Sequence, residues 1–233
     1  MALTPDTGET FLREVDENLR RDQLRTMARK YAPLWIAAVV LLLAAAGGWL
    51  YWQERQKEQA AADSEALAQV YNDIGSGRLA NVPQRLDTLV KNGSTDAVRA
   101  SALFTRAAVA IDQGDRALAI AKYNEIANDG GLASPYRDLG LIRATTLEFD
   151  GLKPDQVIAR MAPLAKPGNA WFGSAGELTA MAMIKQGKRV EAGRLFAAIA
   201  ADRQVPESIR QRAAQIAGTL GVDASAALFA PAQ

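Results

Sequence analysis

The feature that most constrains this chain is a run of apolar residues near its beginning. Residues 34–52 read LWIAAVVLLLAAAGGWLYW and carry no charged side chain. A helix rises about 1.5 Å per residue, so a run of this length crosses a hydrocarbon layer of about 30 Å. Pro33 stands just before the run, where its missing N–H costs a helix little. We therefore predict that residues 34–52 form a helix that spans a lipid bilayer.

Aromatic and basic residues mark the two ends of this predicted span. Rings that prefer the membrane interface flank both ends: Tyr31, Trp35, Trp49, Tyr51 and Trp52. Residues 1–33 contain six Lys or Arg, whereas residues 53–64 contain only Arg55 and Lys57. Because positive side chains near a span favour the cytoplasmic side, this bias predicts a cytoplasmic N-terminus. The larger C-terminal part then lies on the outer side.

A cleaved signal peptide is the competing interpretation of the same run. Residues 34–43 would be its apolar region, and Ala44-Ala45-Ala46 would offer the cleavage site. The preceding segment is long and acidic for such a peptide, and the aromatic cluster after the alanines suits a retained anchor. A lipoprotein is excluded, because acylation there needs a cysteine and the chain has none.

Two further patterns concern how the span is used. Ala44 and Gly48 have the small-xxx-small spacing that lets a second transmembrane helix approach, although small residues are also common in spans without this role. In residues 9–31, apolar side chains fall near one helical face: Phe11 or Leu12, Val15, Leu19 and Met27. This segment either lies on the inner leaflet, docks on a partner, or is a solvated basic helix.

Behind the span, one pattern occurs four times. A turn is followed by apolar or small residues at positions i, i+4 and i+7, the spacing that forms one face of a helix. The four trios are Val82, Leu86 and Leu89; Ala119, Tyr123 and Ile126; Val157, Met161 and Leu164; and Ala192, Phe196 and Ile199. Their first members lie 37, 38 and 35 residues apart. We expect each trio to be packed in the core, because apolar stripes on helices pack.

Glycines mark the turns before these trios. Gly77, Gly114 and Gly187 each stand five residues before a trio, where one helix must stop and a tight turn begin. The third repeat differs by one residue, with Leu152 at that position and Gly151 before it. Ahead of the turns, small residues are expected where two helices cross: Ala107, Ala144 and Ala180, with Val70 fitting less well in the first repeat.

The pattern predicts an all-α fold. We expect a single N-terminal transmembrane helix, then a helical solenoid of about four helix pairs with a period close to the roughly 34 residues of a tetratricopeptide unit. Residues 206–220, between Pro206 and Gly221, predict a last amphipathic helix that caps the open edge. The predicted division is residues 1–33 before the span, 34–52 in it, 53–221 in the repeat domain and 222–233 in a tail.

The repeats carry a resemblance to a known family. Gln113-Gly114-Asp115 followed by Ala119, Tyr123 and Ile126 matches the second half of a tetratricopeptide motif, and Gln186-Gly187 followed by Ala192, Phe196 and Ile199 is similar. The layout of a short segment, one span ending in Gly-Trp-x-Tyr-Trp and divergent repeats resembles the ancillary SecYEG translocon subunits of Gram-negative bacteria. The first and third repeats and the long N-terminal segment depart from the family pattern.

This resemblance implies a place and a role. It implies an inner-membrane protein with residues 1–33 in the cytoplasm and the tetratricopeptide-like domain in the periplasm. Its partners would be Sec translocon subunits, a membrane-anchored periplasmic peptidyl-prolyl isomerase and exported client proteins. The alternative is a scaffold for envelope or cell-division proteins that uses the same surface.

Composition excludes several kinds of chemistry. Without Cys or His, the chain has no thiol nucleophile, disulfide, imidazole base or Cys/His zinc site. Its 27 Lys and Arg against 26 Asp and Glu argue against nucleic-acid binding. Gly173-Ser174-Ala175-Gly176 lacks the G-x-S-x-G pattern, and Gly187-Lys188 lacks the first glycine of a phosphate loop. We predict no enzymatic activity, no cofactor, no metal and no small-molecule substrate.

Stacked helix pairs predict a concave surface formed by the first helix of each repeat, the usual binding face of solenoids. Counting from the turns, the positions expected to face it are Tyr71, Phe104, Ala108, Thr145, Glu148, Glu177 and Met181. Such a mixed but substantially apolar surface suits extended or unfolded protein segments better than a phosphate or a sugar. The competing interpretation is that a neighbouring helix or the tail covers some of these residues, Phe104 and Met181 first.

Overall fold

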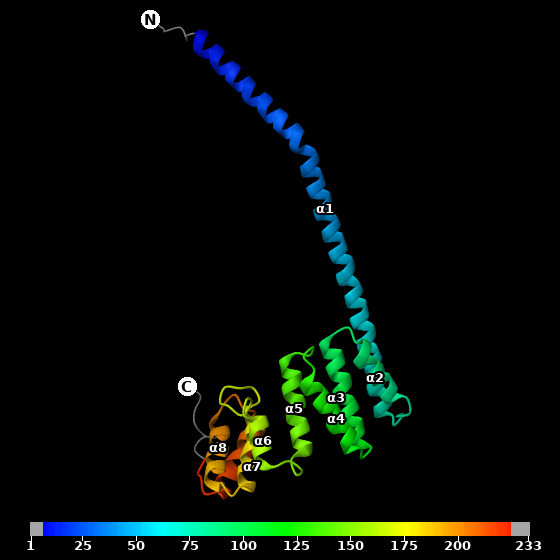
Figure 1. The fold of residues 1–233 in the computed structure, drawn as a ribbon, viewed down its shortest axis with the longest axis vertical. Coiled ribbons are helices and arrows are strands. Elements are labelled where there is room, and N and C mark those ends of the chain that lie inside the picture. Colours follow the sequence, from blue (N-terminus) through cyan, green and yellow to red (C-terminus); the bar gives the residue numbers. More distant parts are fainter. Residues whose placement is uncertain (1–6, 225–233) are drawn as a thin grey trace. The chain divides into compact units, whose positions relative to one another are not determined.

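The computed structural model describes residues 7–224, and of the side chains before Arg29 it describes only that of Met27. Residues 7–224 form nine α-helices and no strand (Figure 1). The helices are α1 (Thr7–Gly75), α2 (Val82–Asn92), α3 (Asp96–Asp112), α4 (Arg116–Asn128), α5 (Ser134–Glu148), α6 (Pro154–Met161), α7 (Phe172–Lys185), α8 (Arg189–Ala201) and α9 (Glu207–Thr219). The prediction of an all-α fold is confirmed.

Helix α1 contains the whole apolar run and continues past it. Pro33 lies inside the helix, and every residue from 34 to 52 is exposed. By length and composition, Arg29–Gly75 includes a segment able to cross a membrane or to act as a signal sequence. A core helix would bury such side chains, and this segment buries none. The predicted amphipathic positions Phe11, Leu12, Val15 and Leu19 lie outside the described side chains.

The chain divides into two compact units, Met1–Gln59 and Ala60–Gln233. The boundary falls within α1, so that the last turns of this helix belong to the second unit. There the end of α1 packs on α2 and α3 through a shared cluster that includes Leu67, Val70, Leu86 and Val98. The pairs α1/α2, α3/α4, α5/α6 and α7/α8 follow one another along the chain, and α9 closes the series.

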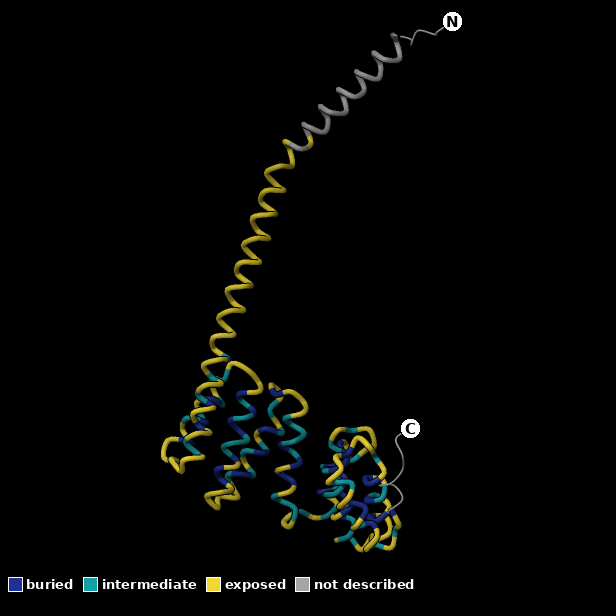
Figure 2. Tube along the Cα trace, turned by 180° about the vertical axis from the view of Figure 1, so that it is seen from behind, coloured by how far each residue is buried: buried dark blue, intermediate teal, exposed yellow. Residues whose placement is uncertain are grey.

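The four predicted trios form the core of the second unit. No member of any trio is more than 6% exposed, which confirms that these stripes pack inward (Figure 2). The small residues expected at helix crossings, Ala107, Ala144 and Ala180, are fully buried, and so is Val70. An alanine there leaves no side chain beyond Cβ, so the two helices can approach closely.

Three of the four turns have one shared geometry. Gly77, Gly114 and Gly187 have φ of 72°, 78° and 80°, the left-handed conformation that glycine adopts at little cost. The N–H of Gly187 donates to Ile184 and that of Lys188 to Met183, both at 2.9 Å, which satisfies the last carbonyls of α7. The third turn is different, because Gly151 has no positive φ and the N–H groups of Gly151 and Leu152 both donate to Glu148.

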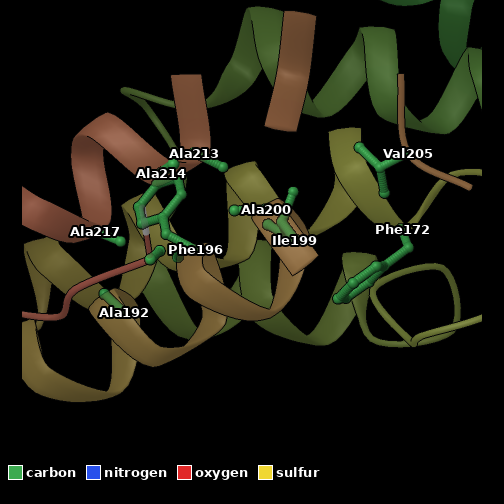
Figure 3. Close-up of a cluster of buried hydrophobic side chains, with 11 residues drawn as sticks. Phe172, Ala192, Phe196, Ile199, Ala200, Val205, Ala213, Ala214 and Ala217 are labelled. Atoms are coloured by element: carbon green, nitrogen blue, oxygen red, sulfur yellow. The ribbon is translucent and has the colours of Figure 1, made fainter. Parts of the chain in front are cut away.

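Helix α9 covers the end of the repeat series. Its face of Ala213, Ala214 and Ala217 is buried in one cluster with Phe196 of α8, as Figure 3 shows. Gly221 ends the helix with φ of 84°. The following residue, Val222, lies close to Gly193 of α8. A Cβ added to Gly193 would lie only 2.8 Å from Cγ2 of Val222. The predicted capping helix is therefore present; residues 225–233 of the tail lie outside the described range.

Candidate protein-binding groove

A groove of about 530 Å³ lies in the second unit between α5, α7 and α9, with Phe196 of α8 contributing to its wall. Helices α5 and α7 are the first helices of the third and fourth repeats, and α9 follows α8 as a further first helix would. The groove therefore lies where the repeat pattern predicts the concave surface. We refer to it below as the α5/α7/α9 groove.

One wall is a single face of α5. Leu139, Ile142, Arg143 and Thr146 line the groove at positions i, i+3, i+4 and i+7. Ile142 is buried at the base of this wall, whereas Arg143 and Thr146 are exposed. The Thr146 hydroxyl donates to the carbonyl of Ile142 at 2.8 Å, so it is already satisfied within the helix.

The opposite wall comes from α7 and the residue before it. Trp171, Ser174, Glu177, Leu178 and Met181 line the groove from this side. Met181 is 43% exposed, a large fraction for a methionine in a packed domain. A flexible thioether side chain at an open surface adapts to irregular apolar partners. This wall therefore offers apolar contact area to a ligand.

Helix α9 supplies Ile216 and Arg212 to the groove. The guanidinium of Arg212 donates through Nε and Nη2 to the two carboxylate oxygens of Glu177, at 2.8 and 2.7 Å. This hydrogen bond, with the negative charge of Glu177, raises the pKa of Arg212 above its ordinary value. The pair joins α7 to α9 and leaves neither oxygen of Glu177 without a donor.

The structure places two of the predicted surface residues, Glu177 and Met181, in the groove. Thr145 does not belong to a binding surface, because its side chain is fully buried and offers nothing to a partner. Glu148 forms an ion pair with Arg160 of α6 at 2.6 Å and borders a different, smaller hollow beside Arg116. The next residue, Thr146, lines the groove instead, on the face of α5 that also carries Leu139, Ile142 and Arg143.

The remaining predicted residues lie on α1 and α3. Tyr71 is 48% exposed, and its hydroxyl accepts a hydrogen bond of 3.4 Å from that of Thr105. Phe104 is half-buried with its ring centroid 6.0 Å from that of Tyr123, so it packs partly against the core. Ala108 is exposed. None of these three lines the α5/α7/α9 groove.

The two small residues of the apolar run that were predicted to pack on another helix are not covered by other described residues. Ala44 and Gly48 are exposed, and a Cβ on Gly48 would meet nothing within 4 Å among the described residues. At the end of the run, the Nε of Arg55 donates to the Tyr51 hydroxyl at 3.1 Å, and the guanidinium lies 5.6 Å from the Tyr51 ring centroid. Such a pair of aromatic and basic side chains is typical of a membrane interface.

Paired helices in series, with a groove between first helices, define a helical-repeat scaffold. The family model of the tetratricopeptide repeat-like domain matches residues 26–217. The chain therefore belongs to this family, whose fold is typically a non-catalytic scaffold for protein interactions. The matched range includes the apolar run as well as the repeats. No curated protein and no solved structure matches the chain.

Proposed function

We propose that this chain is a membrane-anchored protein-binding module that holds a segment of another protein in the α5/α7/α9 groove. The observation that carries the proposal is the groove itself, whose lining combines the exposed Met181 and half-buried leucine and isoleucine side chains of α5, α7 and α9 with a few polar groups. Grooves of this composition gain binding energy when a partner covers their apolar surface. No turnover is required, and the chain acts as a binding protein rather than an enzyme.

The apolar run supports the membrane anchor. Its residues are all exposed in the structure, so an apolar environment other than the chain's own core is needed to cover them. The excess of Lys and Arg before the run supports a cytoplasmic N-terminus and an outer, periplasmic repeat domain. An anchored groove meets its partners at a high local concentration, so even a weak and reversible contact is useful.

The resemblance of the layout to ancillary SecYEG subunits supports the cellular role. We propose that the span holds the groove near the Sec translocon of the bacterial inner membrane. There the groove would contact exported proteins as they emerge, or a membrane-anchored periplasmic peptidyl-prolyl isomerase that folds them. The inclusion of residues 34–52 in the family match is consistent with a span and repeats that function together.

The alternative function is an envelope or cell-division scaffold that uses the same groove for a folded partner. The difference lies in what occupies the groove and what lies beside the span. Unfolded exported chains favour the translocon role, and a single folded partner favours the scaffold.

Site-specific photo-crosslinking of the full-length protein in native membranes tests these proposals. Photoreactive residues are placed at Gly48 in the apolar run, at Met181 in the groove and at Val190, which is 53% exposed on α8 and does not line the groove. We expect translocon adducts from Gly48, and exported or folding-factor adducts from Met181 but not from Val190. Adducts with division or cell-wall proteins alone would establish the scaffold. Equal adducts from Met181 and Val190 would contradict the groove as the binding site.

A further inference from the structure

The charged residues that line the α5/α7/α9 groove do not balance one another. Three of its lining residues carry charge: Arg143, Glu177 and Arg212. Both oxygens of Glu177 accept hydrogen bonds from Arg212, so these two charges neutralise each other. Arg143 remains as one uncompensated positive charge on the groove wall.

Arg143 has no partner of its own. Within residues 7–224, its side chain forms no hydrogen bond and no ion pair, and it is exposed. Neither carboxylate of α5 pairs with it, since Asp138 accepts a hydrogen bond from the Ser134 hydroxyl at 3.2 Å and Glu148 pairs with Arg160. The carboxylate of Asp150, just after α5, pairs with Lys185 at 2.9 Å. The Arg143 guanidinium is therefore free to pair with a carboxylate from outside this part of the chain.

Apolar side chains line the same groove as this free guanidinium. Leu139 precedes it by one turn on the same face of α5, and Leu178, Met181 and Ile216 line the groove from α7 and α9. A partner that fills the groove must bring large apolar side chains and, in the same segment, something to face Arg143. A neutral partner would displace water from the guanidinium without offering a charged acceptor in its place, which costs free energy. A basic partner would add repulsion to that cost.

We infer that the groove selects a protein segment that combines large apolar side chains with a carboxylate, and that Arg143 is the residue that recognises this carboxylate. The inference rests on the proposed protein-binding function of the groove. A planar guanidinium matches a carboxylate with two parallel hydrogen bonds, so the pairing adds specificity as well as affinity. Acidic and apolar segments are therefore bound in preference to neutral or basic ones.

Binding of three peptides to the full-length protein in lipid nanodiscs tests this inference. The fluorescein-labelled peptides share the sequence SGLXALFGS and carry Glu, Gln or Lys at X. By fluorescence anisotropy, the Glu peptide should bind roughly threefold to tenfold more tightly than the Gln peptide, because Arg143 is exposed and its pairing is partly screened. The Lys peptide should bind most weakly, and all differences should shrink at high salt.

Two variants assign the preference to one residue. Arg143→Gln should abolish the difference between the Glu and Gln peptides, because the Glu peptide loses its partner and the Gln peptide no longer covers an unpaired guanidinium. Arg137→Gln makes the same substitution on the same helix at a residue that does not line the groove. It should keep the preference. Matching thermal unfolding curves for the two variants would show that neither change acts through the fold.

Several outcomes overturn the inference and leave the proposed function standing. One is equal binding of the three peptides, which would show that apolar contact alone determines affinity. Another is that none of the three peptides binds, although the photoreactive residue placed at Met181 still forms partner adducts in membranes. A third is that only a variant lacking residues 225–233 binds, and binds all three alike. The groove would then belong to this segment of the chain itself, which has no charged side chain. Loss of the Met181 adducts as well would overturn the proposed function too.

Discussion

The hydroxyl of Thr145 is fully buried and has no hydrogen-bond partner. Burying such a group without a partner costs about 1–3 kcal/mol, so replacing the hydroxyl by a methyl group of similar size removes the cost. Thr145→Val should therefore raise the free energy of unfolding by about 1–2 kcal/mol in urea denaturation. Thr179→Val is the matched control, because the Thr179 hydroxyl donates to the carbonyl of Ala175 at 2.9 Å. This second variant should be neutral or slightly destabilised.

Gly187 stabilises its turn through backbone conformation alone. Its φ is 80°, and a Cβ at this position would meet nothing within 4 Å. Gly187→Ala should thus cost about 1–2 kcal/mol from left-handed strain, without any clash. Gly218 in α9 also has open space around it but has no positive φ, so Gly218→Ala should stabilise by about 0.5–1 kcal/mol. A similar thermal shift in both variants would contradict this account.

The surface-facing residues of a first helix were predicted by counting back from the turn that follows it, so their prediction depended on where that turn was placed. The trios and their burial followed from spacing alone, because apolar stripes of helical period must pack. On α5, counting from Gly151 gave Thr145 as the surface residue. Counting from Leu152, the position equivalent to Gly187, gives Thr146, Arg143, Ile142 and Leu139, which line the groove. One residue turns a helix by about 100°, so the α5 prediction was wrong by one position.

The contribution of α9 to the groove was not predicted. Its sequence indicated a cap, and the structure confirms the cap, but Arg212 and Ile216 also line the groove. The bidentate pairing of Arg212 with Glu177 joins residues 35 positions apart in the sequence. Local patterns do not contain such a pairing, because it depends on the packing of α9 against the preceding pair. The unpaired state of Arg143 is likewise a property of the assembled helices.

The cap is required for the core that it covers. Ala217 is fully buried in one cluster with Ala192 and Phe196. Ala217→Glu would place an unpaired carboxylate there, which should destabilise the domain by more than about 3 kcal/mol. Gln215 is exposed on the same helix, so Gln215→Glu should change stability by less than about 0.5 kcal/mol. Urea denaturation of both variants measures the difference, and equal stabilities would contradict a buried role for this face.

An ion pair joins the end of α7 to the turn after α5. Lys185 lies 2.9 Å from Asp150, and its hydrogen bond and charge lower the pKa of Asp150 below the ordinary 3.8. A lowered pKa in the folded state means that the pair stabilises the fold above pH 3.8 and that this effect is lost as the pH falls through the folded-state pKa. Asp150→Asn should therefore lower the melting temperature slightly at neutral pH and have no effect in strong acid. In a Lys185→Gln background the same substitution should have a much smaller effect at neutral pH, because only the weaker attraction of Arg116 remains.

At the scale of the whole chain, the absence of cysteine makes topology directly measurable, because each introduced thiol is the only one present. Thr26→Cys lies before the apolar run, and Thr219→Cys lies on the exposed end of α9. In intact spheroplasts, a maleimide that cannot cross membranes should label Thr219→Cys and leave Thr26→Cys unlabelled. Opening the membrane with detergent should then expose the second thiol.

The pattern of labelling distinguishes the retained anchor from each alternative. Reversed orientation would label Thr26→Cys in intact spheroplasts and protect Thr219→Cys. Cleavage after the alanines at 44–46 would remove Thr26→Cys from the mature protein, so that detergent would reveal no thiol on it. Only a retained span with a cytoplasmic N-terminus gives labelling of Thr219→Cys before detergent and of Thr26→Cys after it. That result would place the α5/α7/α9 groove on the side of the membrane where exported proteins emerge.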